Sequence, residues 1–380
     1  MKGLPRFPVT VVGSWPRPAY LLEAQRRGSK DLEALRERAC AEAIRDQIEA
    51  GADMPSDGEQ RRDNFFSFLC ERLDGLKLMT MAELLNYVED KAAFEGLLRA
   101  LDVPAFAIKN PVVTGRLARR GSLIGRDLAF ARGKTALPLK LTLPGPYLLS
   151  RSIWVKGLSE AAYPTREALN DDLVRILREE LTELVAAGAD FVQFDEPVLS
   201  ELVFAGKSAT RTFMCAALAA KSSPEEELEL AATLINRVVA GFEGPTIGLH
   251  VCRGNWSTQE DVLLSGSYAE LMPTLRRMGV GQFVLEYATP RAGPVSVLAD
   301  LPANTSLGLG AVNPRTTELE DPEAVAARVR EVTRFVDPER IYLNPDCGFG
   351  TFSERPVASR DLARAKLETL TRAARILRQG

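Results

Sequence analysis

Short apolar segments alternate with longer amphipathic segments along most of the chain. The apolar segments are nearly continuous, as in TIGLHV, FVQFD and FVLEY, rather than strictly alternating. Continuous apolar runs are typical of parallel strands that are buried on both faces. We therefore expect eight strands, at Val9–Ser14, Asp53–Glu59, Leu137–Leu143, Asp190–Asp195, Thr246–Cys252, Gln282–Tyr287, Ser306–Val312 and Ile341–Asp346.

The segments between these strands have the spacing of amphipathic helices. Regular alternation of strands and helices in one chain of this length predicts an α/β fold, a (β/α)8 TIM barrel that forms a single domain over residues 1–380. The clearest helices are expected at Asp171–Ala187, Pro224–Phe242, Ser267–Met278, Pro322–Phe335 and Ser359–Arg378.

The connection between the second and third strands is much longer than a crossover helix requires. It covers approximately residues 60–136 and includes a helical stretch, Met81–Leu101, followed by the extended segment NPVVTGRL. Because long connections in compact domains usually have a function, we expect an inserted helical lobe or hairpin beside the active face of the barrel.

Composition excludes several classes of protein. The 48 basic and 51 acidic residues are nearly balanced, which argues against a nucleic-acid partner or an anionic membrane surface. No apolar run is long enough to span a bilayer, and the first residues lack the apolar region of a secretory signal, so we expect a cytoplasmic protein. Five cysteines in a chain of this size argue against a disulfide framework, and one histidine excludes two-histidine zinc motifs.

Polar and metal-binding residue types occur where the expected strands end. Active residues of such barrels lie at the carboxyl ends of the strands. His250 and Cys252 are two positions apart, so on an extended strand they point to the same face. The polar residues at these ends are Ser14, Glu59, Thr142, Asp195, His250, Cys252, Glu286, Asn313 and Cys347.

Zinc is the metal that best suits the sulfur, nitrogen and carboxylate ligands in this set. The spacing of His250 and Cys252 alone is also compatible with ordinary buried residues; Glu286 and Cys347 make a zinc site the favoured interpretation. A carboxylate among softer ligands is exchangeable, so such a site could bind a substrate thiol as its thiolate. A zinc-binding barrel without catalytic activity is a further alternative.

Several longer motifs resemble the catalytic barrel of the cobalamin-independent methionine synthase family. They are VVGSWPRP, DGEQRRDNFFSFL, LTLPGPY, FVQFDEPVLSE, GLHVC, LEYA and NPDCGFG, which run from the N-terminal third to the end of the chain. Only one barrel is present, so the chain resembles the short core form of the family rather than the two-barrel form.

The resemblance implies four zinc ligands, His250, Cys252, Glu286 and Cys347, and a reaction in which zinc-bound homocysteine is methylated to methionine. It further implies that Ser14 contacts the amino-acid part of homocysteine and that Glu59 and Asp195 bind its ammonium group. Carboxylates at the barrel mouth also suit a cationic amine on physical grounds, although salt bridges to Arg61 or Arg62 would be an alternative use. Glu196 is expected to support the site rather than bind substrate.

The methyl donor is where the chain departs from the family pattern. Ser152 occupies the place of a tryptophan that stacks on the pterin of folate in the family, and Trp154 follows two positions later. Asn313 stands where a family histidine is thought to protonate the departing folate. Methyltetrahydrofolate and a methylcorrinoid, free or on a corrinoid protein, are therefore both candidate donors.

A different reaction uses the same zinc–thiolate chemistry. Epoxyalkane:coenzyme M transferases of the superfamily open an epoxide with coenzyme M, a thiol that carries a sulfonate and no amine. Arg17, Arg61 or Arg62 could pair with that sulfonate. Glu59 and Asp195 favour the amino-thiol instead, so homocysteine methylation is the first interpretation and epoxide opening the alternative.

Overall fold

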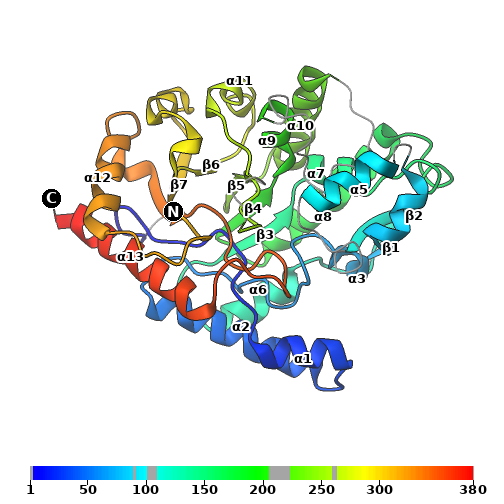
Figure 1. Cartoon of the computed structure of the whole chain (residues 1–380), viewed down its shortest axis with the longest axis horizontal. Helices are drawn as coiled ribbons and strands as arrows, with labels where there is room; N and C mark the ends of the chain where they lie inside the picture. The colour runs from blue at the N-terminus through cyan, green and yellow to red at the C-terminus, as the bar shows by residue number, and fades with distance from the viewer. Residues whose placement is uncertain (1–2, 89–90, 101–108, 205–222, 259–262, 380) are drawn as a thin grey trace.

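A parallel sheet forms the centre of the molecule, with helices around it (Figure 1). The computed structural model describes residues 3–88, 91–100, 109–204, 223–258 and 263–379. Neighbouring strands follow one another in sequence order and are all parallel. They are β3 (Lys140–Pro144), β4 (Phe191–Asp195), β5 (Thr246–Val251), β6 (Gln282–Glu286), β7 (Ser306–Val312) and β8 (Ile341–Pro345).

Three isolated parallel bridges close this sheet into a barrel. Val9 pairs with Leu343 of β8, Thr10 pairs with Met54, and Ser56 pairs with Lys140 of β3. The two chain segments predicted as the first and second strands thus occupy their expected places between β8 and β3. The predicted α/β barrel is confirmed, with six regular strands and two segments that join them through isolated bridges.

These first two segments are much shorter as regular strands than predicted, and their sequence explains the difference. Pro55 has no amide hydrogen to donate to a ladder, and the amide of Val9 donates to the side chain of Asp53 (2.8 Å) instead of to a backbone carbonyl. Gly58 and Glu59 have φ values of 69° and 54°, which turn the chain out of the extended conformation. Prediction of the full ranges Val9–Ser14 and Asp53–Glu59 as strands was therefore wrong in extent.

Helices on the outside of the barrel largely match their predicted ranges, and local caps define several starts. Ser223 and Glu226 form a reciprocal capping box at one of them. The helix predicted over Ser267–Met278 is instead a 3₁₀ turn, Tyr268–Glu270, followed by α11, because Pro273 interrupts the hydrogen-bond ladder. The outer helices are α1 (Ala19–Arg27), α2 (Leu32–Glu49), α6 (Gly125–Arg132), α7 (Pro146–Ser152), α8 (Arg166–Ala186), α9 (Val198–Phe204), α10 (Pro224–Val239), α11 (Met272–Leu275), α12 (Pro322–Val332) and α13 (Arg360–Gln379).

The long connection contains a hairpin with a small core of its own. After α3 (Leu69–Arg72), β1 (Leu73–Thr80) pairs antiparallel with β2 (Lys109–Arg119), and both lie to one side of the barrel with α5 (Figure 1). The sequence predicted the extended segment of β2 but not β1. Apolar side chains of this lobe pack against Trp256 and Phe352, which belong to loops of the barrel. The lobe also includes α4 (Met81–Leu84) and α5 (Lys91–Ala100).

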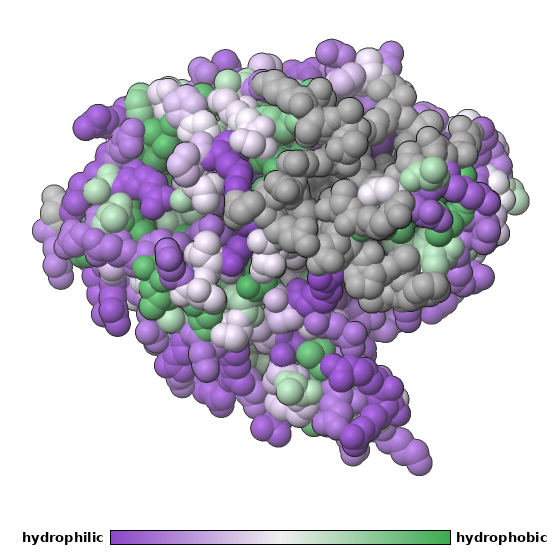
Figure 2. Space-filling model, viewed as in Figure 1, coloured by the Kyte–Doolittle hydropathy of each residue, from purple (hydrophilic) through white to green (hydrophobic). Residues whose placement is uncertain are grey.

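The apolar residues of the strands and inner helix faces form one large buried cluster. On the face drawn in Figure 2, hydrophilic residues predominate and hydrophobic residues occur in small separate groups. Among the described residues, no helix is long and apolar enough to cross a membrane.

Tight packing inside the barrel can be tested at Gly248 of β5. A Cβ atom there would lie 2.6 Å from the ring of Phe191 on β4. We expect Gly248→Ala to lower the free energy of unfolding by about 1–3 kcal/mol through overpacking, measured by urea denaturation. Gly133→Ala is the control, because the nearest atom to its new Cβ, the carbonyl oxygen of Phe130, would be 3.4 Å away and its φ of −70° suits alanine. Equal stability of the two variants would contradict this account of the barrel interior.

Candidate metal centre and substrate cavity

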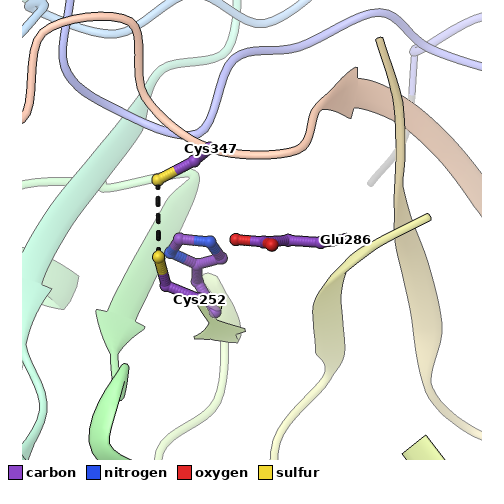
Figure 3. Close-up of side chains that lie close together, drawn as sticks. Cys252, Glu286 and Cys347 are labelled. Atoms are coloured by element: carbon purple, nitrogen blue, oxygen red, sulfur yellow. Dashed lines mark hydrogen bonds between the residues drawn. The ribbon is translucent and has the colours of Figure 1, made fainter. Parts of the chain in front are cut away.

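Four potential metal ligands converge at the carboxyl ends of three strands. One ligand atom from each of His250, Cys252, Glu286 and Cys347 lies within 4.8 Å of all the others. His250 is in β5 and Cys252 follows its last residue; Glu286 ends β6, and Cys347 follows β8 by two residues. Figure 3 shows Cys252, Glu286 and Cys347 pointing toward one another. All four residues are buried.

The two sulfur atoms have the separation that a shared tetrahedral ion requires. Sγ of Cys252 and Sγ of Cys347 are 3.7 Å apart (Figure 3). Two zinc–sulfur bonds of about 2.3 Å at a tetrahedral angle place the sulfurs roughly 3.8 Å apart. The amide of Gly254 donates to Sγ of Cys252 (3.3 Å), an arrangement that also stabilises a thiolate. The residues present thus fit a zinc ion.

His250 is oriented by Asp195, the last residue of β4. These two residues are direct neighbours in the parallel register, and Nδ1 of His250 lies 2.9 Å from Oδ1 of Asp195. Nε2 of His250 is buried and has no hydrogen-bond partner. A proton on Nδ1 that is held by the carboxylate leaves the Nε2 lone pair for a metal ion, as in many zinc sites. Gln193 donates to the same Asp195 oxygen (2.9 Å).

This pairing dominates the acid–base behaviour of the imidazole. Burial lowers the pKa of His250, but the hydrogen bond and charge of Asp195, with smaller contributions from Cys252 and Glu286, raise it to about 9. In the metal-free chain, a hydrogen bond with Cys347 and burial raise the pKa of Cys252 well above its ordinary value. A metal ion must therefore displace protons from the cluster when it binds.

Glu286 is held by the loop that follows β5. Its Oε1 accepts from the backbone amide of Arg253 (3.0 Å) and its Oε2 accepts from the side-chain amide of Asn255. Asp346, beside Cys347, accepts from the amides of Tyr287 (2.9 Å) and Ala288 (2.8 Å) and so fixes the backbone directly after Glu286. Burial, together with the charge of Glu286, raises the pKa of Asp346 to about 8.

A cavity leads to the cluster, with about 680 Å³ of space when the part open to solvent is included. Three of the four candidate ligands and all three predicted substrate-binding residues border it. Much of its remaining wall is aromatic. The lining residues are Val12, Ser14, Glu59, Phe65, Phe66, Asp195, Pro197, His250, Cys252, Trp256, Cys347, Gly348, Thr351 and Phe352.

Glu59, which lines this cavity, has one carboxylate oxygen without a hydrogen-bond partner. Its Oε1 accepts from the hydroxyl of Thr142 (2.8 Å), whereas its Oε2 is buried and has no partner. A Cβ atom at Gly13 would lie only 2.4 Å from Oε1, so glycine is required for the carboxylate to lie here. Burial raises the pKa of Glu59, although the guanidinium groups of Arg62 and Arg17 oppose this. A cationic ligand would relieve the cost of the buried carboxylate.

The other two predicted substrate residues have partners within the protein. Oγ of Ser14 accepts from the amide of Gly350 (3.3 Å), and Gly348 leaves the space that this hydroxyl occupies. Oδ1 of Asp195 is already used by His250 and Gln193. Asp195 thus orients the imidazole whether or not it also contacts a substrate.

The arginines considered as partners for an anionic substrate are engaged elsewhere. Arg17 donates to the backbone carbonyls of Gly350, Glu59 and Arg62. Arg61 pairs with Asp127 and with two glutamates of α2. Arg62 donates to the hydroxyl and carbonyl of Thr142. No lysine or arginine is among the described residues that line the cavity.

Residues at the departures from the family pattern lie outside the cavity lining. The indole of Trp154 donates to the carbonyl of Tyr163 (3.0 Å), and the hydroxyl of Ser152 donates to the carbonyl of Leu148 (2.6 Å). Asn313 accepts from the amide of Arg315 through its side chain (3.0 Å).

Glu196 accepts from the amides at the start of α7, those of Tyr147 and Leu148 (both 2.8 Å). Burial raises its pKa to about 8. As expected, Glu196 supports the neighbouring structure and does not border the cavity.

Sequence reasoning missed several residues that shape the site. Asn255 and Asp346 were not selected, although Asp346 lies inside the NPDCGFG motif beside Cys347. The strand-end rule could have found Asp346, because it follows β8 directly. Asn255 and the aromatic wall gave no such signal, because their positions depend on loop conformations.

A parallel barrel with a candidate metal centre at the carboxyl ends of its strands defines the class of this protein. The chain belongs to the family described as cobalamin-independent synthase, catalytic domain, which matches residues 7–375. The predicted family membership is confirmed.

Named relatives agree with this assignment. The chain is 26% identical to a methionine synthase of Saccharolobus solfataricus, over 100% of this chain and 97% of the relative. It is 28% identical to a methionine synthase of Sulfolobus acidocaldarius, over 98% and 93% of the two chains. A B12-independent methionine synthase structure from Shewanella, in complex with selenomethionine, has the same fold, with a TM-score of 0.73, 24% identity and coverage of 99% and 98%. A putative vitamin-B12 independent methionine synthase from Listeria monocytogenes has a TM-score of 0.71, 20% identity and 99% coverage of both chains.

The single histidine allows a direct test of the His250–Asp195 pair by NMR. In the chain kept metal-free with a chelator, we expect the imidazole to titrate with a pKa of about 9, above its ordinary 6.5. Asp195→Asn should bring this pKa down toward or below 6.5, because burial then opposes the charged form without a compensating carboxylate. The resonances need no assignment, since the chain has one histidine. A pKa near 6.5 in both proteins would show that the pair does not form.

Proposed function

We propose that this protein is a zinc-dependent methyltransferase that converts homocysteine to methionine. The observation that carries the proposal is the convergence of His250, Cys252, Glu286 and Cys347 at a cavity that Glu59, with one unpartnered carboxylate oxygen, also lines. The names of the relatives, methionine synthases, support the same reaction.

The four residues suit zinc by ligand type, by the sulfur separation and by the unpartnered Nε2 of His250. Zinc in such a site would supply the Lewis acidity that keeps a coordinated substrate thiol deprotonated at neutral pH. Asp195 contributes by fixing the ring orientation of His250, and Asp346 contributes by fixing the loop after Glu286. Both carboxylates act on the ligands rather than on the methyl group.

In this proposal, Glu59, Ser14 and Asp195 recognise the amino-acid part of homocysteine. Oε2 of Glu59 accepts a hydrogen bond from the substrate ammonium, which turns a costly buried acceptor into a charge-assisted pair. Ser14 lies close to Cys347 through the contact of its hydroxyl with Gly348 and Gly350, so it is placed to contact the rest of the amino-acid group. Asp195, on the same wall, adds negative charge that favours a cationic amine.

We further propose a methylated reduced folate as the donor. The rings of Phe65, Phe66, Trp256 and Phe352 form an apolar wall of the cavity against which a planar heterocycle can lie. Trp154 does not provide that wall, because its indole donates a hydrogen bond to the carbonyl of Tyr163. The family is described as cobalamin-independent and the Shewanella structure as B12-independent, and this favours folate over the corrinoid alternative.

Epoxide opening with coenzyme M is not favoured. A sulfonate would need a positive partner, but the described lining of the cavity has none and includes the carboxylates of Glu59 and Asp195. These negative charges would repel a sulfonate and weaken the binding of coenzyme M.

Zinc content tests the ligand assignment. We expect the purified chain to hold close to one zinc per molecule and Cys347→Ala to lose both the metal and turnover, because a thiolate ligand is removed. Cys70→Ala, a partly exposed cysteine of α3, is the matched control and should keep both. Metal analysis of the dialysed proteins provides the measurement. Undiminished zinc in Cys347→Ala would refute the proposed site.

Glu59→Gln tests recognition of the ammonium. With 5-methyltetrahydrofolate as donor, and methylcobalamin assayed in parallel, we expect the KM for homocysteine to rise about 10- to 100-fold, since a hydrogen bond between charged groups is lost. The wild-type chain should also prefer homocysteine to 4-mercaptobutanoate, which lacks the amine, and Glu59→Gln should narrow that preference. If Glu59→Gln prefers homocysteine over 4-mercaptobutanoate as strongly as the wild type does, Glu59 is not the ammonium partner. If the wild type is active with methylcobalamin but not with 5-methyltetrahydrofolate, folate is not the donor.

A further inference from the structure

Glu286 differs from the other candidate ligands in the space that it borders. His250, Cys252 and Cys347 line the main cavity, whereas Glu286 lines a second, small pocket. Arg253, Asn255, Thr289 and Arg291 contribute to the wall of this second pocket. The Glu286 carboxylate therefore lies between the metal-ligand cluster and a separate space on the β5–β6 side of the barrel.

Hydrogen-bond donors surround the carboxylate in that direction. The backbone amide of Arg253 and the side chain of Asn255 each donate to one oxygen of Glu286. Asn255 is buried, with 4% of its surface exposed. The guanidinium of Arg253 lies over the rings of Tyr268 (4.1 Å) and Phe204 (4.6 Å), and its Nε and Nη2 are buried without a hydrogen-bond partner. Buried donors without partners are uncommon, and a carboxylate is their natural acceptor.

We propose that this second pocket is a receiving site for the Glu286 carboxylate, in which Asn255 and Arg253 hold it when the substrate sulfur replaces it on the metal. The inference rests on the proposed function, because it requires a metal-bound thiol. Asn255 is then a positioning residue that acts through Glu286. Asn255 thereby determines how readily the substrate sulfur replaces Glu286 on the metal.

Charge explains why such a site is needed. A divalent ion with two thiolates and one carboxylate has a net charge of −1, and a third thiolate would make it −2 in a buried site. Moving the carboxylate away restores the original charge at the ion, but a buried carboxylate needs donors and positive charge around it. Arg253 and Arg291 bring that positive charge to the wall of the second pocket.

Asn255→Ala separates this role from a purely structural one. Without its amide donor, Glu286 should remain on the metal. Zinc affinity, measured by chelator competition without thiol, should stay unchanged or become tighter, whereas the affinity of the zinc-loaded chain for homocysteine should fall about tenfold. X-ray absorption of the zinc-loaded variant with homocysteine should retain an oxygen scatterer that the wild type loses. Thr289→Ala, in the wall of the same pocket but without a hydrogen bond to Glu286 among those described, should behave as wild type in all three measurements.

The opposite pattern would overturn the inference. Weaker zinc binding with an unchanged homocysteine affinity of the loaded variant would mean that Asn255 only supports Glu286 as a ligand. The wild type provides the separate check on the proposed function. If homocysteine adds no sulfur scatterer to the zinc of the wild-type chain, the proposed function itself fails; if it does so equally in both proteins and with equal affinity, only the receiving site fails.

Discussion

Closure of the sheet through the bridges at Val9, Thr10 and Ser56 is the constraint on which the rest of the molecule depends. The first segment lies between the last strand and the second segment, so residues from opposite ends of the sequence meet at one mouth. Ser14 reaches the loop that follows Cys347 only because of this closure. The amides of Thr10, Asp53 and Lys140 donate to backbone carbonyls across the closure, and the large buried cluster packs around it.

The mouth of the barrel concentrates carboxylates that are mostly held by backbone amides or by neighbouring side chains. Asp195 aligns His250, Asp346 aligns the segment after Glu286, and Glu196 anchors α7. Each acidic group removes freedom from a neighbour, which holds the four candidate ligands near the arrangement that a metal ion requires. Preorganisation of this kind limits the reorganisation that accompanies binding. Glu59, which lines the cavity, is the exception, since one of its oxygens is buried without a hydrogen-bond partner.

Much of this arrangement follows from the sequence, and the limits are physical. Continuous apolar runs located the six regular strands, and the strand-end rule selected the residues that meet in the cluster. Regular strands were overestimated at Pro55 and at Gly58, where backbone chemistry overrides an apolar pattern. The pairing of Asp195 with His250 depends on the register of β4 and β5, which a pattern of apolar positions does not specify. The role of Asn255 depends on the path of a loop, and strand β1 has no continuous apolar run.

The distance along the chain between the two cysteines has a mechanical consequence. Cys252 and Cys347 are 95 positions apart, so an ion bound to both would tie the last strands of the barrel into a closed loop. Such a tie acts on the unfolded chain as a covalent cross-link does, since it removes many of its extended conformations. Unlike a disulfide, it forms without an oxidant and is removed by a chelator. The carboxyl-terminal part of the barrel would therefore resist unfolding more strongly when metal is available in its surroundings.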